Sequence, residues 1–344
     1  MLAELAGFQK RGCPVWLLAP ENAVVFQRAK AAGVPVVPLN VSRLLLPLNV
    51  VRLARWLRRE RIEALNPHSS RDGWLLGLAG RLARVPLILR TRHIDVDYPN
   101  AWISRHAFTT LADHVLTTSE KITAHFQEIF DLPDERISTV PTGIDLERFS
   151  PEGPRAELVT GAHGLPLIGM VSVLRSWKGH TTFLQAARQL LDTGFKARFV
   201  IVGDGPMRPV VTQEIAALKL NDAVTLLGHR EDVPEVLRAL DVLVIASTRH
   251  EGVPQIGLQA LATKTPVVGS DVGGTPEIIR DGETGRNFPA EDVGALARAI
   301  RESLSETDAT RRMCEHGRAR AEEHHSLDAM LDRLDGIYRR CVVV

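Results

Sequence analysis

The sequence predicts an α/β protein of two domains, each built around a parallel, doubly wound sheet. Short runs of Val, Ile and Leu alternate with longer segments of helical composition, the order expected of strands joined by crossover helices. The chain has 344 residues, more than one typical domain core. A Pro-, Gly- and Glu-rich segment interrupts the alternation and separates the two domains.

The first domain is predicted over residues 1–145. Leu2, Leu5 and Phe8 recur at a spacing of three, so the chain opens in an amphipathic helix. Expected strands cover residues 14–19, 34–37, 62–66, 87–90 and 115–118. Expected helices cover a segment ending at Ala32, residues 48–61, residues 72–83 and a segment capped by Ser119.

A linker is predicted over residues 146–165 and the second domain over residues 166–325. Expected strands cover residues 167–174, 197–202, 224–227, 241–246 and 266–269. Expected helices cover residues 178–191, 207–220, 255–263 and the region after Pro289. A last helix is expected within residues 326–344.

Composition excludes several classes of protein. Apolar residues make up 44% of the chain and the net charge is +1, which favours a globular protein over a disordered one. No apolar run has the length of a membrane span, no signal peptide is recognisable, and the three cysteines form no disulfide or zinc pattern, so we expect a cytoplasmic protein. We expect no metal site. We also expect no nucleic-acid binding, since no basic run is interleaved with aromatic residues.

The stretch from residue 240 to residue 279 contains two strand-to-helix turns. The first is a polar loop with Glu251, and its sequence Gly252-Val253-Pro254-Gln255 leads into a helix, with Pro at a favoured starting position. The second has the sequence Gly273-Gly274-Thr275-Pro276-Glu277. Free N–H groups and the positive ends of two helix dipoles predict an anion site here.

Glu251 has two interpretations on sequence alone. It is either a helix-capping acid or an acceptor for the hydroxyl groups of a polyhydroxy ligand. Gln259 lies eight residues further along, about two helical turns away and broadly on the same face.

These motifs resemble the donor site of the retaining glycosyltransferases of family 4, which have the GT-B fold. The similarity rests on residues 251–255, 259–262 and 265–268 and on the run from Gly273 to Glu277. It implies two Rossmann-like domains that face each other across a cleft, and transfer of a sugar from a UDP- or GDP-linked donor to an acceptor hydroxyl without a cofactor. It also implies that the last helix returns to the first domain.

The resemblance implies roles for individual residues. Glu251 would orient the donor sugar, backbone groups of residues 252–255 would bind sugar hydroxyls, and Gln259 would bind the ribose. The turn that includes Gly274, Thr275 and Glu277 would complete the donor site.

The sequence departs from the family pattern at three places. The second of two Glu residues eight apart is Gln259, a neutral and weaker acceptor. The family's Arg, five residues before its Lys, is Val173 here. Family members also begin with a strand and a glycine-rich turn that this sequence lacks, so we expect unpaired backbone inside the first sheet.

Two further loops of the second domain carry candidate ligands. Arg175 and Lys178 follow a strand and either form a solvated turn or, as the resemblance implies, hold a diphosphate. Gly203-Asp204-Gly205 is a weak dinucleotide-type motif, because Arg208 occupies the place of a third glycine; a tight turn is the alternative. His229 and Arg230 match the family's loop beside the base.

Two histidines of the first domain are candidates. His93 follows a strand and would contact the reacting sugar by resemblance, whereas a polar loop residue is the alternative. His68 is a weaker candidate for the acceptor side. Asp95-Val96-Asp97 looks like a metal-binding motif of another fold, and we interpret it as coincidence.

The helix predicted from Leu48 to Arg61 carries five arginines beside Leu53, Trp56 and Leu57. It is either an ordinary surface helix or a basic face for anionic lipid headgroups. The second reading predicts a peripheral protein at the inner face of the membrane with a saccharide or lipid-linked acceptor.

The predicted function is that of a retaining glycosyltransferase, with bacterial surface polysaccharide or lipopolysaccharide assembly as the expected pathway. The alternatives are a non-catalytic relative that binds nucleotide sugar or serves as a scaffold, and an epimerase or phosphorylase of the same fold.

Overall fold

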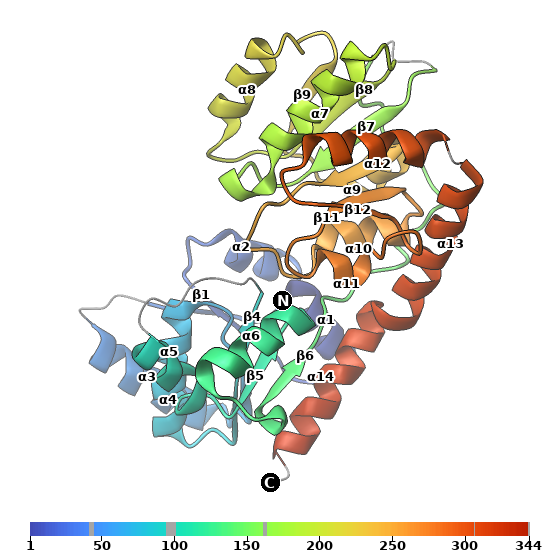
Figure 1. Ribbon diagram of the computed structural model, residues 1–344. Helices are drawn as coiled ribbons and strands as arrows, with labels where there is room; N and C mark the ends of the chain where they lie inside the picture. The colour runs from blue at the N-terminus through green and yellow to red at the C-terminus, as the bar shows by residue number, and fades with distance from the viewer. Residues whose placement is uncertain (41–44, 94–100, 161–163, 306, 343–344) are drawn as a thin grey trace. The chain divides into compact units, whose positions relative to one another are not determined.

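The computed structural model describes residues 1–40, 45–93, 101–160, 164–305 and 307–342. The chain forms two compact units (Figure 1). The first unit combines Met1–Gly143 with Leu327–Val344, and the second is Ile144–Ser326. Parallel strands alternate with helices in both units, which confirms the predicted α/β class and its two parallel-sheet domains.

The strands of the first unit form two separate parallel sheets. In the described residues one sheet pairs β1 with β2, and the other has the order β3-β4-β5-β6. The strands are β1 Leu17–Ala19, β2 Val36–Pro38, β3 Ala64–Leu65, β4 Leu87–Arg92, β5 His114–Thr117 and β6 Ile137–Thr139.

Helices cover both sheets of the first unit. They are α1 Leu2–Lys10, α2 Val24–Ala31, α3 Leu46–Arg59, α4 Ser70–Ala83, α5 Ala101–Thr109, α6 Glu120–Phe130, the 3-10 turn η1 Asp134–Arg136 and α14 Leu327–Val342. Strand β4 is buried on both faces: Leu87 and Leu89 pack against α1 and α14, whereas Ile88 packs in a cluster with residues of α3 and α4. Ser119 caps α6 as predicted, because its Oγ accepts a hydrogen bond from Ile122 N–H at 3.1 Å.

The second unit contains one parallel sheet of order β12-β11-β10-β7-β8-β9. Its strands are β7 Leu167–Val171, β8 Arg198–Val202, β9 Val224–Gly228, β10 Val242–Ile245, β11 Val267–Ser270 and β12 Arg286–Phe288. Its helices are α7 His180–Asp192, α8 Arg208–Ala217, α9 Val233–Ala239, α10 Gln255–Ala262, α11 Thr275–Ile278, α12 Val293–Ser305 and α13 Thr307–His324, with the 3-10 turn η2 Ser176–Lys178.

Two apolar layers enclose this sheet. Along β8, Phe199 and Ile201 join the cluster that contains residues of α7 and α12. Val200 and Val202 join the opposite cluster, which contains residues of α9 and α10. The two-residue period of the strand sends alternate side chains to opposite faces, so the four buried positions, residues 199–202, are all apolar.

Several elements were not predicted from the sequence, among them β6, β12, α5 and α9. Strands β6 and β12 are three-residue strands at the edges of their sheets, and each contains polar residues. Strands at the edge of a sheet are less buried than central strands and can contain polar residues. They therefore lack the apolar run from which a strand is predicted.

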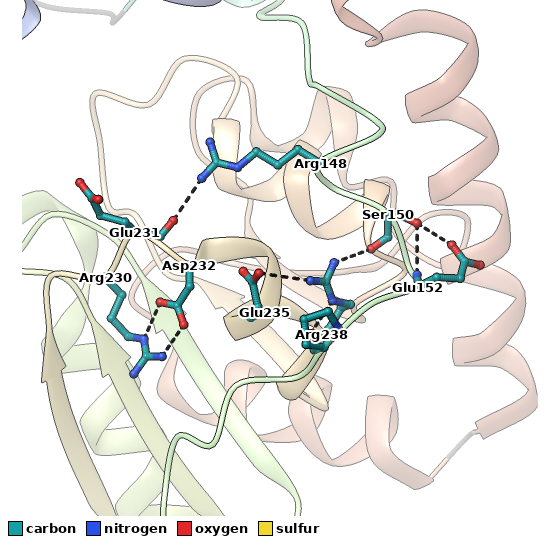
Figure 2. Close-up of polar contacts among 9 residues, drawn as sticks. Arg148, Ser150, Glu152, Arg230, Glu231, Asp232, Glu235 and Arg238 are labelled. Carbon is teal, nitrogen blue, oxygen red and sulfur yellow. Dashed lines mark hydrogen bonds and ion pairs between the residues drawn. The ribbon is translucent and has the colours of Figure 1, made fainter. Parts of the chain in front are cut away.

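The segment before β7, predicted as a linker, packs onto the second unit over its described part. Figure 2 shows Arg148 donating to the carbonyl of Glu231 at 3.1 Å and Arg238 donating to the carbonyl of Ser150 at 2.9 Å. Phe149 and Leu158 are buried in the same cluster as α9 and α10. This segment is therefore part of the second unit's core.

None of the described helices combines the length and the hydropathy that crossing a membrane requires.

Candidate functional site

A cavity of about 530 Å³ lies in the second unit at the carboxyl ends of its central strands. Strands β10, β7 and β8 are neighbours in the sheet, and the loops that follow each of them line the cavity. Their carboxyl ends share one edge because they are parallel, and ligands of open α/β sheets bind at that edge.

Lys178 and Glu251 meet at this cavity. The Nζ atom of Lys178 lies 2.6 Å from Oε2 of Glu251, and both residues line the cavity wall. The Glu251 side chain is only 10% exposed and that of Lys178 is 23% exposed. Both side chains of the ion pair are thus mostly removed from water, and both still line the cavity.

Ser247 completes the environment of the carboxylate. Its Oγ donates to the same Glu251 Oε2 at 2.5 Å, and Ser270 Oγ donates to the carbonyl of Ser247 at 2.7 Å. Among the described residues no donor reaches the other oxygen, Oε1. Two partners thus orient the carboxylate, and one oxygen stays available to a ligand.

Gly273 holds the second turn against the backbone of Glu251. Its φ is +58°, and a Cβ atom there would lie 1.8 Å from the Glu251 carbonyl oxygen. Gly274 N–H also donates to that carbonyl at 3.3 Å. The two turns predicted from the sequence are therefore in contact, and the backbone of the second turn packs against the backbone of Glu251 in the first.

Glycines shape the other two loops as well. At Gly179, with φ +72°, a Cβ atom would lie 1.8 Å from the carbonyl oxygen of Ala246. At Gly203, with φ +134°, it would lie 1.9 Å from that of Ser172. The loops after β7, β8 and β10 approach one another so closely that only glycine fits these positions.

The amino end of α10 borders the cavity. Pro254 and Gln255 line it at the start of the helix, and Gln259 lines it one turn further on. Glu251 accepts from Lys178 and Ser247, and α10 has no side-chain cap. These contacts do not support the capping interpretation of Glu251.

His229 and Arg230 line another part of the cavity wall, with Gly203 and Asp204. Arg230 is held by Asp232, whose Oδ1 accepts from Arg230 Nε at 2.9 Å (Figure 2). This charged hydrogen bond raises the pKa of Arg230 and lowers that of Asp232. Arg230 therefore presents a fixed cation.

The remaining predicted residues of the second unit do not line the cavity. Arg175 is exposed, and its guanidinium lies 5.7 Å from the ring centroid of Trp177, whereas Val173 lies in the cavity wall. The others that are not among the lining residues are Gly205, Gly252, Val253, Gly274, Thr275 and Glu277.

His180 lies behind Lys178 at the start of α7. Its Nε2 is 3.2 Å from Ser172 Oγ. Burial, together with the nearby charge of Lys178, lowers the pKa of His180 to about 4. His180 is therefore neutral at pH 7.

The two candidate histidines of the first unit are in contact with each other. His68 Nδ1 lies 2.9 Å from His93 Nε2, and the two ring planes are within 7° of parallel with centroids 5.1 Å apart. Removal from water and the neighbouring His93 lower the pKa of His68 to about 3, and removal from water also lowers the pKa of His93. Both rings are therefore neutral at pH 7, one donating to the other. Asp95 and Asp97 lie outside the described residues.

Family models match both units. Residues 2–148 match the model described as Glycosyltransferase Family 4, and residues 165–306 match Glycosyl transferases group 1. The alpha-D-kanosaminyltransferase of Streptomyces kanamyceticus is 30% identical over 84% of this chain and 80% of its own length. This chain belongs to the group 1 glycosyltransferases.

Other relatives of this group 1 glycosyltransferase agree. The UDP-Gal:alpha-D-GlcNAc-diphosphoundecaprenol alpha-1,3-galactosyltransferase of Escherichia coli is 28% identical over 79% of this chain and 74% of its own length. A Rickettsia africae glycosyltransferase has a TM-score of 0.88 at 20% identity, covering 99% of this chain and 93% of its own. Anabaena HepE in complex with UDP has a TM-score of 0.87 at 19% identity, covering 98% and 95%. The structural matches show the GT-B fold.

Sequence reasoning assigned no ligand role to several residues that line this glycosyltransferase's cavity, among them Ser172, Val173 and Ser247. The first two follow β7 and Ser247 follows β10, so their positions just after buried strands could have indicated them. Small polar or apolar residues carry no chemical signature of their own, and only the contact between Ser247 and Glu251 distinguishes that serine.

Proposed function

We propose that this glycosyltransferase moves a sugar from a nucleotide diphosphate donor, UDP- or GDP-linked, to an acceptor hydroxyl with retention at the anomeric carbon. The observation that carries the proposal is the contact between Lys178 and Glu251 at the rim of the second unit's cavity. A cation and a carboxylate placed together there fit the two ends of a sugar diphosphate. In support, the E. coli relative is named for a UDP-galactose donor, and HepE was crystallised with UDP.

The ammonium group of Lys178 binds the diphosphate in this proposal. It has three N–H donors and gives one to Glu251. The other two serve phosphate oxygens. Arg175 remains a proposed diphosphate ligand that would have to leave its place beside Trp177.

Glu251 binds the donor sugar through Oε1. Ser247 and Lys178 orient its carboxylate, which can accept hydrogen bonds from sugar hydroxyls. Backbone groups of residues 252–255 and the turn through Gly274, Thr275 and Glu277 support this part of the site. Gln259 binds the ribose, while His229 and Arg230 lie beside the base.

The reaction breaks the bond between the anomeric carbon and the diphosphate oxygen and forms a bond from that carbon to the acceptor oxygen. The acceptor's proton leaves with the diphosphate, on whose oxygen negative charge develops. Lys178 stabilises that charge, and loss of one such interaction typically costs about 2.7–4 kcal/mol of transition-state stabilisation.

The neutral pair of His68 and His93 serves the sugar and acceptor side. His93 would donate to or accept from a sugar hydroxyl near the reacting centre. His68 fixes the orientation of the His93 ring through the 2.9 Å contact.

A panel of UDP-, GDP- and ADP-sugars tests the proposal by thermal shift, because a bound donor raises the melting temperature by mass action. Product formation is then followed with saccharide and lipid-linked acceptors, and NMR of the product gives its anomeric configuration. Binding and transfer with retention are expected. Binding without turnover would support the non-catalytic alternative, and conversion without an acceptor would support an epimerase or phosphorylase.

The acceptor belongs to surface polysaccharide or lipopolysaccharide synthesis in this proposal. The E. coli relative's name specifies a diphosphoundecaprenol-linked acceptor, which is the lipid-linked type. Transfer to such an acceptor would support this assignment, and transfer only to water-soluble aminocyclitols would contradict it.

We also propose peripheral membrane binding through α3, and the surface of this helix supports the proposal. Leu48 and Val51 are 46% and 38% exposed on the same helix as the exposed Arg52 and Arg55. Exposed apolar residues beside cations suit the interface of an anionic bilayer.

Cosedimentation with phosphatidylglycerol vesicles tests this binding, with phosphatidylcholine vesicles as the neutral comparison. The double variant Arg52→Glu/Arg55→Glu should lose most binding to the anionic vesicles. Arg298→Glu/Arg312→Glu, which makes the same charge change at exposed residues of the second unit, should retain it. Equal loss in both variants would contradict a role for α3.

A further inference from the structure

Ser172 is the first residue after β7, and it lines the cavity of the proposed donor site. Its backbone lies against the end of β8. Ser172 N–H donates to the carbonyl of Val202 at 2.9 Å, and a Cβ atom on Gly203 would lie 1.9 Å from the Ser172 carbonyl oxygen. Lys178 instead reaches Glu251, which follows β10. Because β7 lies between β10 and β8, Ser172 is on the β8 side of that ion pair.

The hydroxyl group of Ser172 contacts a buried histidine. Its Oγ atom lies 3.2 Å from Nε2 of His180, the first residue of α7. His180 is only 5% exposed and is not among the residues that line the cavity, whereas Ser172 is half-buried and lines it. The serine therefore lies between a buried imidazole and the space that a donor would fill.

A second hydrogen bond of the His180 ring determines what Ser172 offers to a ligand. Burial and the charge of Lys178 lower the pKa of the ring, whereas a hydrogen bond with the Arg175 backbone acts in the opposite direction. A carbonyl that accepts from a ring N–H has this effect. The Arg175 N–H is already used, because it donates to the carbonyl of Val173 at 2.9 Å. Since Nε2 faces Ser172, the ring nitrogen that donates to the Arg175 carbonyl is Nδ1.

The neutral ring then accepts a proton at Nε2, and Ser172 supplies it. A neutral imidazole has one N–H donor and one bare nitrogen that accepts. A serine that donates its O–H to this nitrogen has only lone pairs left for the cavity. It accepts from an O–H or N–H group of a ligand and cannot donate to phosphate oxygens or to base carbonyls, which are acceptors themselves.

The order of the cavity wall identifies the ligand group that faces Ser172. In the proposed function Glu251 binds the donor sugar, Lys178 binds the diphosphate, and the loop after β9 lies beside the base. The strands that carry these loops have the order β10-β7-β8-β9. A nucleotide sugar has the order sugar, diphosphate, ribose and base, so the ribose lies between Lys178 and the loop after β9. Ribose has two hydroxyl groups, and Gln259 and Ser172 can accept from one each.

We propose that Ser172, oriented by His180, accepts a hydrogen bond from one ribose hydroxyl of the donor and thereby selects donors that carry both ribose hydroxyls. This inference rests on the proposed function, because it places a nucleotide diphosphate in the cavity. Ser172 is the binding residue, and His180 is a positioning residue that acts through it. A deoxyribonucleotide that lacks the hydroxyl leaves an acceptor of the cavity wall without its partner, which weakens binding.

Calorimetry with three forms of one nucleotide tests the contact. UDP, 2′-deoxy-UDP and 3′-deoxy-UDP are titrated into the full chain at pH 7, and the three corresponding forms of GDP are titrated in parallel. The parent should bind each deoxy form of its preferred nucleotide about tenfold more weakly than the ribonucleotide. Ser172→Ala should lose the discrimination against one deoxy form and keep it against the other. Ser176→Ala, at an exposed serine of η2 outside the cavity wall, should keep both.

Two measurements test the role of His180. His180→Phe keeps a ring of similar size but removes the acceptor of the Ser172 proton. It should reduce the same discrimination that Ser172→Ala abolishes, and it should not change the discrimination further in the Ser172→Ala background. A merely structural role would weaken all three ligands by the same factor. Two-bond ¹H–¹⁵N NMR spectra at pH 7, assigned with His180→Phe, should show the His180 proton on Nδ1.

Two results would overturn the inference while the proposed function stands. One is a Ser172→Ala variant that discriminates against both deoxy forms as the parent does. The other is a His180 proton on Nε2, which would make Ser172 a donor for phosphate. A parent that binds none of the six nucleotides would refute the proposed function and this inference with it. The Ser172→Ala titrations and the spectrum of the unaltered chain do not depend on whether His180→Phe folds.

Discussion

The ammonium nitrogen of Lys178 and a carboxylate oxygen of Glu251 lie 2.6 Å apart although 73 residues separate them in the sequence. Each residue follows a strand of the same parallel sheet, and β7 and β10 are neighbours in it. The pair is the centre of the proposed donor site.

Replacing Lys178 should abolish most sugar transfer. In Lys178→Ala the charge that develops on the diphosphate loses its partner, so kcat should fall about 10²- to 10³-fold. Lys196→Ala, which removes an exposed lysine just before the amino end of β8, the end opposite to the cavity, should stay within twofold of the parent. Steady-state kinetics with the donor found in the panel provides the measurement, and a Lys178→Ala enzyme with near-parental kcat would refute the role.

The ion pair between Lys178 and Glu251 should also contribute to the free energy of unfolding. Lys178→Met leaves the mostly buried Glu251 carboxylate without its cation, which should lower the free energy of unfolding by about 3 kcal/mol. The double variant Lys178→Met/Glu251→Gln removes both charges and should recover more than half of this loss while remaining inactive. Urea denaturation measures both, and a double variant less stable than the single one would show that the two residues are not coupled.

Gly273→Ala should damage both fold and site. The new Cβ atom would overlap the carbonyl oxygen of Glu251 at a backbone φ of +58°, so the loop must move. We expect a loss of about 2–3 kcal/mol and weaker donor binding. Gly282→Ala is the matched control, because its φ is +71° but nothing lies within 4 Å of the added atom. It should cost only about 1 kcal/mol, the cost of the backbone conformation.

Acid should destabilise the chain through His180. Its folded-state pKa of about 4 lies below the unfolded value near 6.5, so between these values the unfolded chain binds more protons. The stability contributed by the neutral ring is present above pH 6.5 and is lost as the pH falls toward 4, on the order of 3 kcal/mol in total. His180→Gln should make the pH dependence of urea unfolding between pH 7 and pH 4 less steep, with the contributions of His68 and His93 remaining, whereas the exposed His316→Gln should leave it unchanged. Parallel curves for all three proteins would contradict this account.

Gln259→Glu should tighten donor binding. The residue lines the cavity, and a charged acceptor binds a ribose hydroxyl more strongly than an amide does. Calorimetry should give a several-fold lower Kd. Gln255→Glu places the same charge at the exposed first residue of α10 and tests whether negative charge near the helix start is sufficient. If both variants gained affinity equally, the specific contact with ribose would be wrong.

Sequence patterns indicated which residues follow the strand ends. They did not indicate the direction in which each of those side chains points. Lys178, Glu251 and Gln259 all line the predicted cavity, because the register of parallel strands determines where the following loops begin. Arg175 was grouped with Lys178 on proximity, yet the 3-10 turn between them places it beside Trp177. Such a turn depends on contacts with another loop, including Thr248 N–H to the Trp177 carbonyl, and local sequence does not encode those contacts.

The contact between His68 and His93 also could not be predicted from local sequence. His68 and His93 were each identified as candidates after strands, but their mutual contact depends on the adjacent pairing of β3 and β4. Sequence periodicity predicts that strands exist, and it does not predict which of them are neighbours. The interaction therefore became visible only in three dimensions.

Gly179, Gly203 and Gly273 constrain how this enzyme can diverge. Main chain meets main chain at all three positions, so these parts of the rim are intolerant of any side chain. The wall positions Val173, His229 and Gln259, in contrast, already carry side chains that line the cavity. Relatives can therefore acquire new donor preferences by exchanging those side chains, while the loops that carry Lys178 and Glu251 keep their shape.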